Sequence, residues 1–314
     1  MKISTSQSSV WTTFYPDAEY YKSIRKAGFR YIDYNFYERL GSDDSVYLKP
    51  DWEKQVEITL REMETAGVKP VICHAPKGEP MRDEEGILRR TMRAAECCAK
   101  MGIDRMVYHP GSLPGMTREE YKAFNIAYVN KLMPTLEKTG VMLLLENLGR
   151  WDEPYYSRTA EDVLDLIETI DHPLYQACLD TGHLSLGEEA QYKTVCALGS
   201  HLKGLHVQDN FGAMPVGMRN GPWRQDLHLP PMTGRVDFDG LMQGLIKIGY
   251  TGSFNIELEA PRAYGKENKY APEPKLRTVS RELAESFYSW VYRIAEYMLG
   301  QYGLNEPDAE TNRG

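Results

Sequence analysis

Ten residues, LYQACLDTGH from Leu174 to His183, contain the pattern from which the fold can be predicted. Their apolar run is typical of a short buried strand, and Asp180 and His183 come where that strand reaches its end. A solvated loop would explain the carboxylate alone, but not a carboxylate followed three residues later by an imidazole. Whether these two residues belong to a functional site depends on whether other strands of the chain end in the same way.

Seven other short β-branched or aliphatic runs have this form, and amphipathic helical stretches alternate with them along almost the whole chain. The helical stretches 51–67, 84–102 and 117–140 each end at a Gly, as helix C-caps do, and we expect Pro134 to kink the third. This alternation predicts parallel strands with helical crossovers. The eight strand-like runs are KIST (2–5), RYIDYNF (30–36), KPVICHA (69–75), RMVYHP (105–110), VMLLLEN (141–147), YQACLD (175–180), LKGLHVQ (202–208) and SFNIELE (253–259).

Eight strand–helix units in one chain predict an α/β protein with a (β/α)8 TIM barrel, whose usual length is about 250 residues. We therefore expect one domain over residues 1–314, with the excess in long loops at about 208–236 and 261–276. Both segments are rich in Gly, Pro and aromatic residues, and both follow predicted strand ends, where barrel enzymes carry their functional loops. A doubly wound open sheet is the alternative, but no Gly-rich phosphate-binding pattern follows the first strand.

Polar side chains close six of the predicted strands, and four of these strand ends follow one another roughly every 35 residues. The carboxyl ends of barrel strands share one mouth, so these side chains should converge. A single His, Asp or Glu at a strand end is usually a satisfied or solvated group, but crowded carboxylates repel one another unless a cation offsets their charge. Since His with Asp or Glu is the ligand set of zinc, manganese and related metals, the pattern predicts a metal site. The residues are His74, His109, Glu146, Asp180 with His183 just beyond it, His206 and Glu257.

Composition narrows the class of protein further. The net charge is −8 and no basic block stands out, which disfavours nucleic acid as a partner. The N-terminus lacks the apolar segment of a signal peptide, and no apolar run approaches the roughly 20 residues that span a bilayer. Five cysteines, two of them adjacent at Cys97 and Cys98, do not form the pattern of a disulfide framework. These features predict a reduced, cytoplasmic protein that does not enter the membrane.

With these residues assembled, the sequence resembles the xylose isomerase-like TIM-barrel superfamily from KIST to the FNIELE strand. This superfamily contains sugar isomerases and epimerases as well as endonucleases of the endonuclease IV type. In its ketose epimerases, one divalent metal is held by Glu, Asp, His and Glu from strands five to eight. The resemblance implies that the corresponding ligands here are Glu146 in LLLEN, Asp180 in CLDTGH, His206 in LHVQDN and Glu257 in NIELE.

The sequence is also similar to endonuclease IV, which binds three zinc ions. Five further residues match the remaining ligands of that trinuclear site in order: His74 in CHAP, His109 in YHPGS, His183, and Asp226 with His228 in DLHLPP. Taken alone, this match favours phosphodiester cleavage, because clustered metals hold both the attacking and the leaving oxygen. However, the stretch DLHLPPMTGRVDF also resembles those of sugar isomerase-like members, and HAPKGEP does not resemble a DNA-penetrating loop. The balance favours a sugar substrate, and the resemblance also leaves room for a homo-oligomer.

The resemblance thus implies a metal-dependent sugar isomerase or epimerase that acts on a ketose or related carbohydrate by proton transfer through a metal-stabilised enediolate. Glu146 and Glu257 are the candidate bases, and the metal is expected to be Mn²⁺, Zn²⁺, Co²⁺ or Mg²⁺. With one metal, His183 would bind a substrate oxygen. The alternatives are a carbohydrate-cleaving lyase or hydrolase of the same barrel family, a phosphodiesterase similar to the endonuclease, and a non-catalytic binding barrel. Further candidates for substrate binding are Asp152, Arg219 and Arg224, with Trp11, Phe14, Tyr108, Trp151 and Trp223 as an apolar wall.

Overall fold

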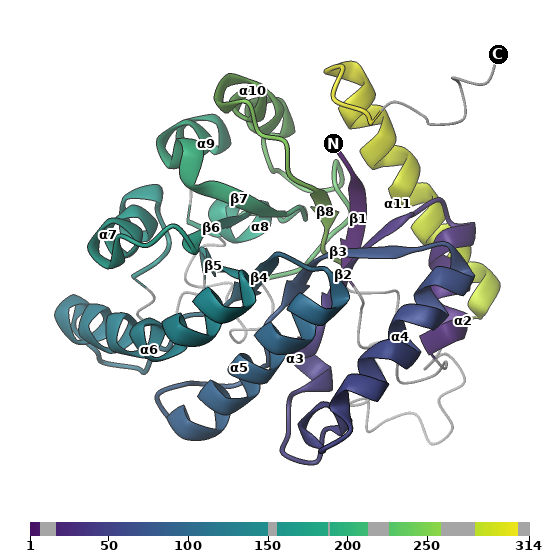
Figure 1. The fold of residues 1–314 in the computed structure, drawn as a ribbon. Coiled ribbons are helices and arrows are strands. Elements are labelled where there is room, and N and C mark those ends of the chain that lie inside the picture. The colour runs from purple at the N-terminus through teal and green to yellow at the C-terminus, as the bar shows by residue number, and fades with distance from the viewer. Residues whose placement is uncertain (7–16, 150–155, 188, 213–225, 259–279, 307–314) are drawn as a thin grey trace, which may run out of the picture.

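Eight parallel strands form a barrel at the centre of the molecule, and the helices surround it (Figure 1). The computed structural model describes residues 1–6, 17–149, 156–187, 189–212, 226–258 and 280–306. The strands pair in the order β7-β6-β5-β4-β3-β2-β1-β8, and a parallel bridge between Val207 and Ile256 brings the two ends of this sheet together. The predicted (β/α)8 barrel is therefore confirmed. The strands are β1 (Ile3–Ser6), β2 (Tyr31–Asn35), β3 (Lys69–His74), β4 (Arg105–Tyr108), β5 (Met142–Glu146), β6 (Tyr175–Asp180), β7 (Leu202–His206) and β8 (Phe254–Ile256).

The helices begin and end largely where the sequence predicts. Gly67 and Gly102 adopt left-handed φ angles of 75° and 73° directly after α4 and α5, as C-cap glycines do. Helix α6 continues through Pro134 to Thr139. The α-helices are α2 (Asp17–Lys26), α3 (Phe36–Arg39), α4 (Trp52–Ala66), α5 (Glu84–Met101), α6 (Arg118–Thr139), α7 (Ala160–Ile170), α8 (Thr181–Leu186), α9 (Gln191–Leu198), α10 (Phe238–Ile248) and α11 (Arg281–Gln301), with 3₁₀ turns at Val46–Leu48 and Gly199–His201.

The interior of the barrel is divided into an apolar and a polar side. Ile72, Val107, Leu144 and Cys178, one from each of β3 to β6, form a buried cluster inside the sheet. Buried polar residues lie on the other side of the interior: Ser4 of β1, Asp33 of β2 and Asn255 of β8. The side chains at the mouth of the barrel therefore lie above apolar residues on one side of the interior and above polar residues on the other.

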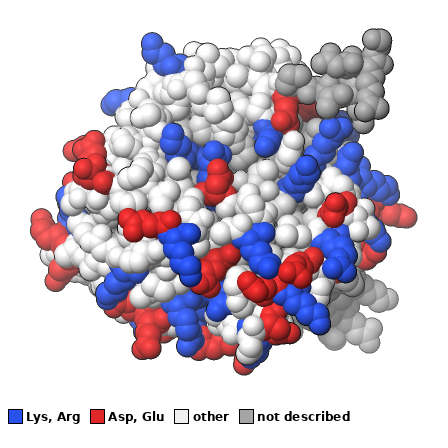
Figure 2. Space-filling model, viewed as in Figure 1, with Lys and Arg blue, Asp and Glu red and all other residues white. Residues whose placement is uncertain are grey.

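The outer surface bears on the predictions that the protein has no basic block and does not enter a membrane. On the face in view, Lys and Arg are interspersed with Asp and Glu (Figure 2). None of the helices in the described ranges is long and apolar enough to span a membrane. Of the two predicted long loops, residues 213–225 and all of 261–276 lie outside the described residues, and the single domain over 1–314 stays a prediction.

Candidate metal centre

The predicted polar strand ends meet at the carboxyl end of the barrel, where nine side chains form three groups. Within each group, one oxygen or nitrogen atom per residue lies within 4.8 Å of those of the other members. The groups lie side by side, because Glu146 belongs to two of them and Glu257 approaches the third. The first group is His74, His109 and Glu146, the central group is Glu146, Asp180, His206 and Glu257, and the third group is His183, Asp226 and His228.

In the first group, two imidazoles point at one oxygen of a buried carboxylate. The Nε2 atom of His109 is 3.1 Å from Glu146 Oε2, and Nε2 of His74 is 3.5 Å from the same oxygen. The His74 Nδ1–H donates to the backbone carbonyl of Ala75 at 3.0 Å, which leaves its Nε2 with a lone pair. The first group therefore offers two nitrogen atoms and one carboxylate oxygen, a set that suits zinc or a related metal.

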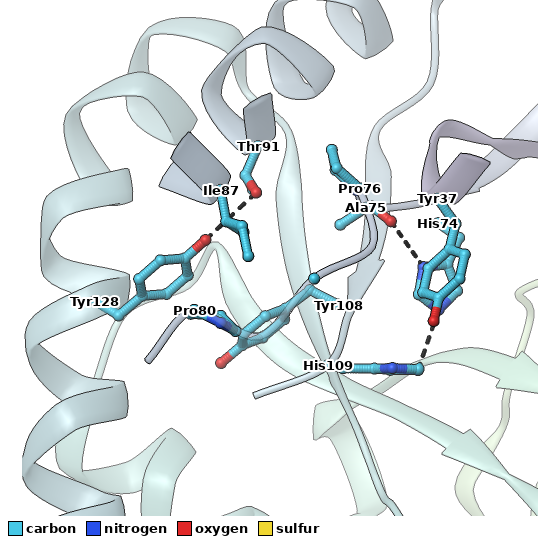
Figure 3. A pocket seen from close by; sticks show the side chains of 11 residues that line it. Tyr37, His74, Ala75, Pro76, Pro80, Ile87, Thr91, Tyr108, His109 and Tyr128 are labelled. Atoms are coloured by element: carbon cyan, nitrogen blue, oxygen red, sulfur yellow. Dashed lines mark hydrogen bonds between the residues drawn. The ribbon is translucent and has the colours of Figure 1, made fainter. Parts of the chain in front are cut away.

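A pocket adjoins the first group on the side of α5 and α6 (Figure 3). His74, Tyr37 and His109 lie at one side of it, and Tyr128 and Thr91 at the other, where their hydroxyl groups are 3.4 Å apart. Its volume is about 340 Å³ including the open entrance. Of the predicted aromatic wall, Tyr108 lines this pocket, and its hydroxyl group bonds that of Tyr175 at 2.7 Å. The pocket therefore joins the polar groups of the mouth to a lining that combines imidazoles and hydroxyl groups with apolar side chains.

The central group combines three carboxylates with one imidazole. The Nδ1 atom of His206 lies 3.3 Å from Glu146 Oε1 and 3.0 Å from Glu257 Oε2. Asp180, the last residue of β6, is fully buried, and its Oδ1 accepts the backbone N–H of His183 at 2.6 Å because it caps α8. This cap fixes the offset between Asp180 in the central group and His183 in the third.

The third group is held by the chain that follows β7. Backbone hydrogen bonds of 2.8 and 3.0 Å join Asp209 and Leu229 in both directions and bring Asp226 and His228 back over the barrel mouth. His183 and His228 each place Nε2 near Asp226 Oδ2, at 3.1 and 3.2 Å. His228 has a φ of 44°, in the left-handed region that non-glycine residues rarely adopt. Its backbone is therefore fixed by this local pairing rather than by intrinsic preference.

The pKa values of the carboxyl groups reflect the crowding of charge. Burial and the charges of Glu146 and Glu257 raise the pKa of Asp180 to about 7. Burial alone would also raise the pKa of Glu257, but the charge of the nearby His206 imidazole outweighs burial and lowers this pKa to about 2. In the same way, the charges of His206 and His109 overcome burial and hold the pKa of Glu146 well below its usual range. Without a cation, the group is balanced only by imidazoles held in their charged form.

Two atoms of the central group test whether a divalent ion suits it. His206 Nδ1 and Glu257 Oε2 are buried, and although they lie 3.0 Å apart, neither forms a hydrogen bond of good geometry with the other or with any other described residue. Such orphaned atoms cost free energy unless another partner satisfies them. An ion held by one nitrogen and three carboxylates would do so, and this donor set is one that zinc, manganese and related metals accept. The residues of the central group therefore fit a divalent metal.

The residues that hold these side chains in place were not predicted. Asn147 accepts the Asp180 N–H at 2.7 Å with its side chain, and its backbone carbonyl receives the His183 Nδ1–H at 3.0 Å. Gln208 donates to Asp180 Oδ2 at 3.2 Å and to Asp226 Oδ1 at 3.3 Å, which links the central and third groups. An added Cβ at Gly182 would lie 2.3 Å from the Gln208 side chain, so the glycine allows this close approach. The signal available in the sequence was an amide one residue after the end of β5, in LEN, and another two residues after the end of β7, in HVQ.

The structure places nine of the predicted site residues together, and the predicted substrate contacts are not among them. Their predicted roles as metal ligands or bases remain hypotheses. The residues that lie outside the described part of the chain are Trp11, Phe14, Trp151, Asp152, Arg219, Trp223 and Arg224.

A parallel eight-stranded barrel with His, Asp and Glu gathered at the carboxyl ends of its strands defines the class of TIM-barrel proteins with a candidate metal site. Residues 21–283 match the family model of the xylose isomerase-like TIM barrel. The match covers most of the chain, and the protein belongs to this family.

Relatives within this family include sugar isomerases and epimerases. Inosose isomerase of Bacillus subtilis is 23% identical over 230 residues, which cover 68% of this chain and 74% of the relative. D-psicose 3-epimerase of Ruminiclostridium cellulolyticum is 25% identical over 147 residues, 46% of this chain and 48% of the relative. A probable endonuclease 4 of Mesomycoplasma hyopneumoniae is 28% identical over 129 residues, 38% of this chain and 44% of the relative.

Among solved structures, the IolI protein with a bound zinc atom superimposes with a TM-score of 0.71 at 18% identity. The alignment covers 96% of this chain and 99% of that protein. At this identity the likeness shows that the two chains share the fold.

Proposed function

We propose that the protein is a divalent-metal-dependent isomerase or epimerase of a ketose or related carbohydrate, and that it works by proton transfer. The observation that carries the proposal is the central group, in which two Glu side chains approach one imidazole nitrogen at the barrel mouth. The presence of sugar epimerases and isomerases among the relatives supports it. The proposal includes a small-molecule sugar as the partner, no nucleic acid, a homo-oligomer in the cytoplasm, and Mn²⁺, Zn²⁺, Co²⁺ or Mg²⁺ as the metal.

In this proposal, Glu146, Asp180, His206 and Glu257 hold the ion. A divalent ion in such a site polarises a carbonyl group and stabilises negative charge on neighbouring oxygens. Epimerisation requires one base to remove the proton next to the carbonyl and another group to return a proton to the opposite face. Glu146 and Glu257 come from the ends of β5 and β8, so they can approach a substrate from different sides.

The two candidate bases differ in accessibility. The Glu257 side chain is 19% exposed, whereas that of Glu146 is 1% exposed and has histidine nitrogens near both oxygens. Glu257 is therefore the base that a substrate can reach more easily. Glu146 can accept a proton from the substrate only when one of its contacts with a histidine is broken. His183 donates its Nδ1–H to the Asn147 carbonyl, so its Nε2 can donate to a substrate oxygen beside the metal only in the charged form. Burial opposes that form, but the charges of Asp180 and Asp226 outweigh burial and raise the pKa of His183.

A second candidate function, metal-dependent phosphodiester hydrolysis, is favoured by one observation. All three groups are already assembled, and Glu146 joins the first to the central group through its two oxygens. An arrangement of three metals would hold both the attacking and the leaving oxygen of a phosphodiester. The similarity to a probable endonuclease 4 agrees with this alternative.

Paired histidine substitutions separate the two functions. His206→Gln should abolish either activity, whereas His109→Gln, outside the central group, should abolish only the hydrolase. The wild type and both variants are assayed with a panel of ketoses in D₂O and with a duplex that contains an abasic site, and their metal content is measured. We expect deuterium next to the carbonyl of a converted sugar, retained by His109→Gln, and no incision. Incision of the duplex with loss in both variants would establish the second candidate instead.

A further inference from the structure

A chain of buried polar side chains runs through the barrel interior to the central group. Ser4 on β1, Asp33 on β2 and Asn255 on β8 are 0%, 2% and 0% exposed. The Ser4 hydroxyl group donates to Asn255 Oδ1 at 2.9 Å, and Asn255 Nδ2 donates to Asp33 Oδ2 at 2.9 Å. The same Asp33 oxygen lies 3.4 Å from Nε2 of His206. The chain therefore ends beneath the imidazole of the central group.

The donors in this chain all point towards Asp33. An ionised carboxylate can only accept hydrogen bonds, and Asn255 already donates one to it. Nε2 of the fully buried His206 makes no hydrogen bond of good geometry with the described residues, and the acceptor that lies beside it is Asp33 Oδ2, at 3.4 Å. A hydrogen on Nε2 that points to Asp33 leaves the lone pair on Nδ1, the atom that faces Glu146 and Glu257. Only this tautomer presents His206 to a cation between the carboxylates.

The other buried imidazoles are oriented differently. His74 and His183 direct Nδ1 to the backbone carbonyls of Ala75 and Asn147, each at 3.0 Å. His206 has a carboxylate in the corresponding place. A carboxylate behind a ligating imidazole fixes its ring and increases its basicity, and loss of such a partner typically weakens metal affinity about 10–100-fold.

We propose that Asp33 is a positioning residue of the metal centre, which accepts the His206 Nε2–H and so directs Nδ1 to the ion. This role rests on the metal centre proposed above. It adds β2 to the strands that serve the site, although Asp33 itself does not reach the ion or the substrate. The charge of Asp33 also offsets part of the positive charge that the ion brings into the barrel.

Asp33→Asn tests the charge with little change in shape. Both contacts of Asp33 fall on Oδ2, so the amide oxygen of Asn can take the same place. The matched control is Asp162→Asn, because Asp162 is also buried but pairs with Arg118 at 2.7 Å and caps α7 far along the chain. Both substitutions are made in a background with His109→Gln and His228→Gln. These two changes remove a histidine from the first and the third group and leave all four residues of the central group in place. Zn²⁺ affinity of the metal-stripped proteins is measured by competition with a chelator.

We expect Asp33→Asn to raise the Zn²⁺ dissociation constant about 10–100-fold. The control should lose thermal stability but keep the dissociation constant of its background. An unchanged dissociation constant in folded Asp33→Asn would overturn the proposal. If no divalent ion binds to the background protein or to the wild type, the metal centre itself is wrong, and the role of Asp33 fails with it.

A measurement on the wild type covers the case in which Asp33→Asn does not fold. Long-range ¹H–¹⁵N correlation spectra of protein labelled at histidine report which ring nitrogen carries the hydrogen, and His206→Gln assigns the signal. With Zn²⁺ bound, His206 should carry hydrogen on Nε2 and bind the ion through Nδ1. The opposite tautomer in the zinc-loaded wild type would refute the role of Asp33, while leaving the metal centre in place.

Discussion

Replacing Glu257 by Gln should remove a base while the metal is retained. In the structure, Glu257 contributes Oε2 to the contact with His206 Nδ1 at 3.0 Å. A Gln side chain can present its carbonyl oxygen at that position and turn its amide group to the partly exposed side. It still offers one ligand oxygen, but it cannot accept a proton from the substrate.

The size of the effect follows from the loss of one acid–base group. Such groups contribute about 10²–10⁴-fold to the rate, which corresponds to about 2.7–5.4 kcal/mol of activation free energy. We therefore expect a fall of that size in kcat, with metal content and sugar binding close to those of the wild type. Conversion of the ketose that the wild type accepts is measured together with deuterium incorporation from D₂O and with metal content.

Glu146→Gln is the comparison that makes this prediction specific. Glu146 points one oxygen at His109 and the other at His206, so a Gln must turn its amide group towards one of these nitrogens. We expect this variant to lose metal affinity as well as turnover. Full activity of a metal-loaded Glu257→Gln variant would refute the assignment of Glu257 as a base. Wild-type conversion without deuterium incorporation would refute proton transfer and favour a hydride shift.

Three further predictions concern stability. Removal of bound metal should lower the melting temperature, since an ion present at 100 times its dissociation constant stabilises the folded state by about 2.7 kcal/mol; scanning calorimetry with and without chelator measures this. Burial alone would raise the pKa of Glu285, but hydrogen bonds from Lys26, Ser23 and Arg281 lower it, so Glu285→Gln should cost about 1–2 kcal/mol at neutral pH. This difference in unfolding free energy between the wild type and Glu285→Gln should persist above the unfolded-state pKa of Glu285 and vanish as the pH falls through its lowered folded-state pKa. Denaturant unfolding at several pH values measures it, and a difference that stays constant with pH would contradict the prediction. Leu144→Ala in the barrel interior should cost about 2–5 kcal/mol, whereas Leu283→Ala, with Leu283 56% exposed, should change the unfolding free energy by less than about 0.5 kcal/mol.

The sequence predicted the elements well because their signals are local. The run YQACLD coincides with β6, and the glycines at 67 and 102 end their helices in the left-handed conformation. The convergence of the polar strand ends could be predicted from one rule, that the carboxyl ends of all the parallel strands lie at the same mouth of a barrel. These inferences depend on the spacing of residue types along short segments, which a single sequence displays directly.

The supports of the site could not be predicted in this way. Asp33 lies in the run RYIDYNF, where apolar and aromatic neighbours do not indicate that it faces the barrel interior. Its partner Asn255 is 222 residues away and comes close only because β8 pairs with β1 next to β2. Similarly, the left-handed backbone at His228 depends on the pairing of Leu229 with Asp209. Contacts of this kind appear only when the sheet has closed.

If more than one of the three groups takes up metal, we expect their charges to set the order in which they do so. The central group has three carboxylates, with Asp33 behind its imidazole, whereas the first and third groups each have one carboxylate. A divalent ion should therefore enter the central group first, because more negative charge offsets it there and because the free energy cost of the crowded carboxylates is relieved. In a stepwise Zn²⁺ titration followed through the histidine ¹⁵N signals, that of His206 should change during the first equivalent, before those of His109 and His228. Earlier changes at His109 or His228 would show that charge does not set the order, and would weaken the case for a function that depends on a single metal.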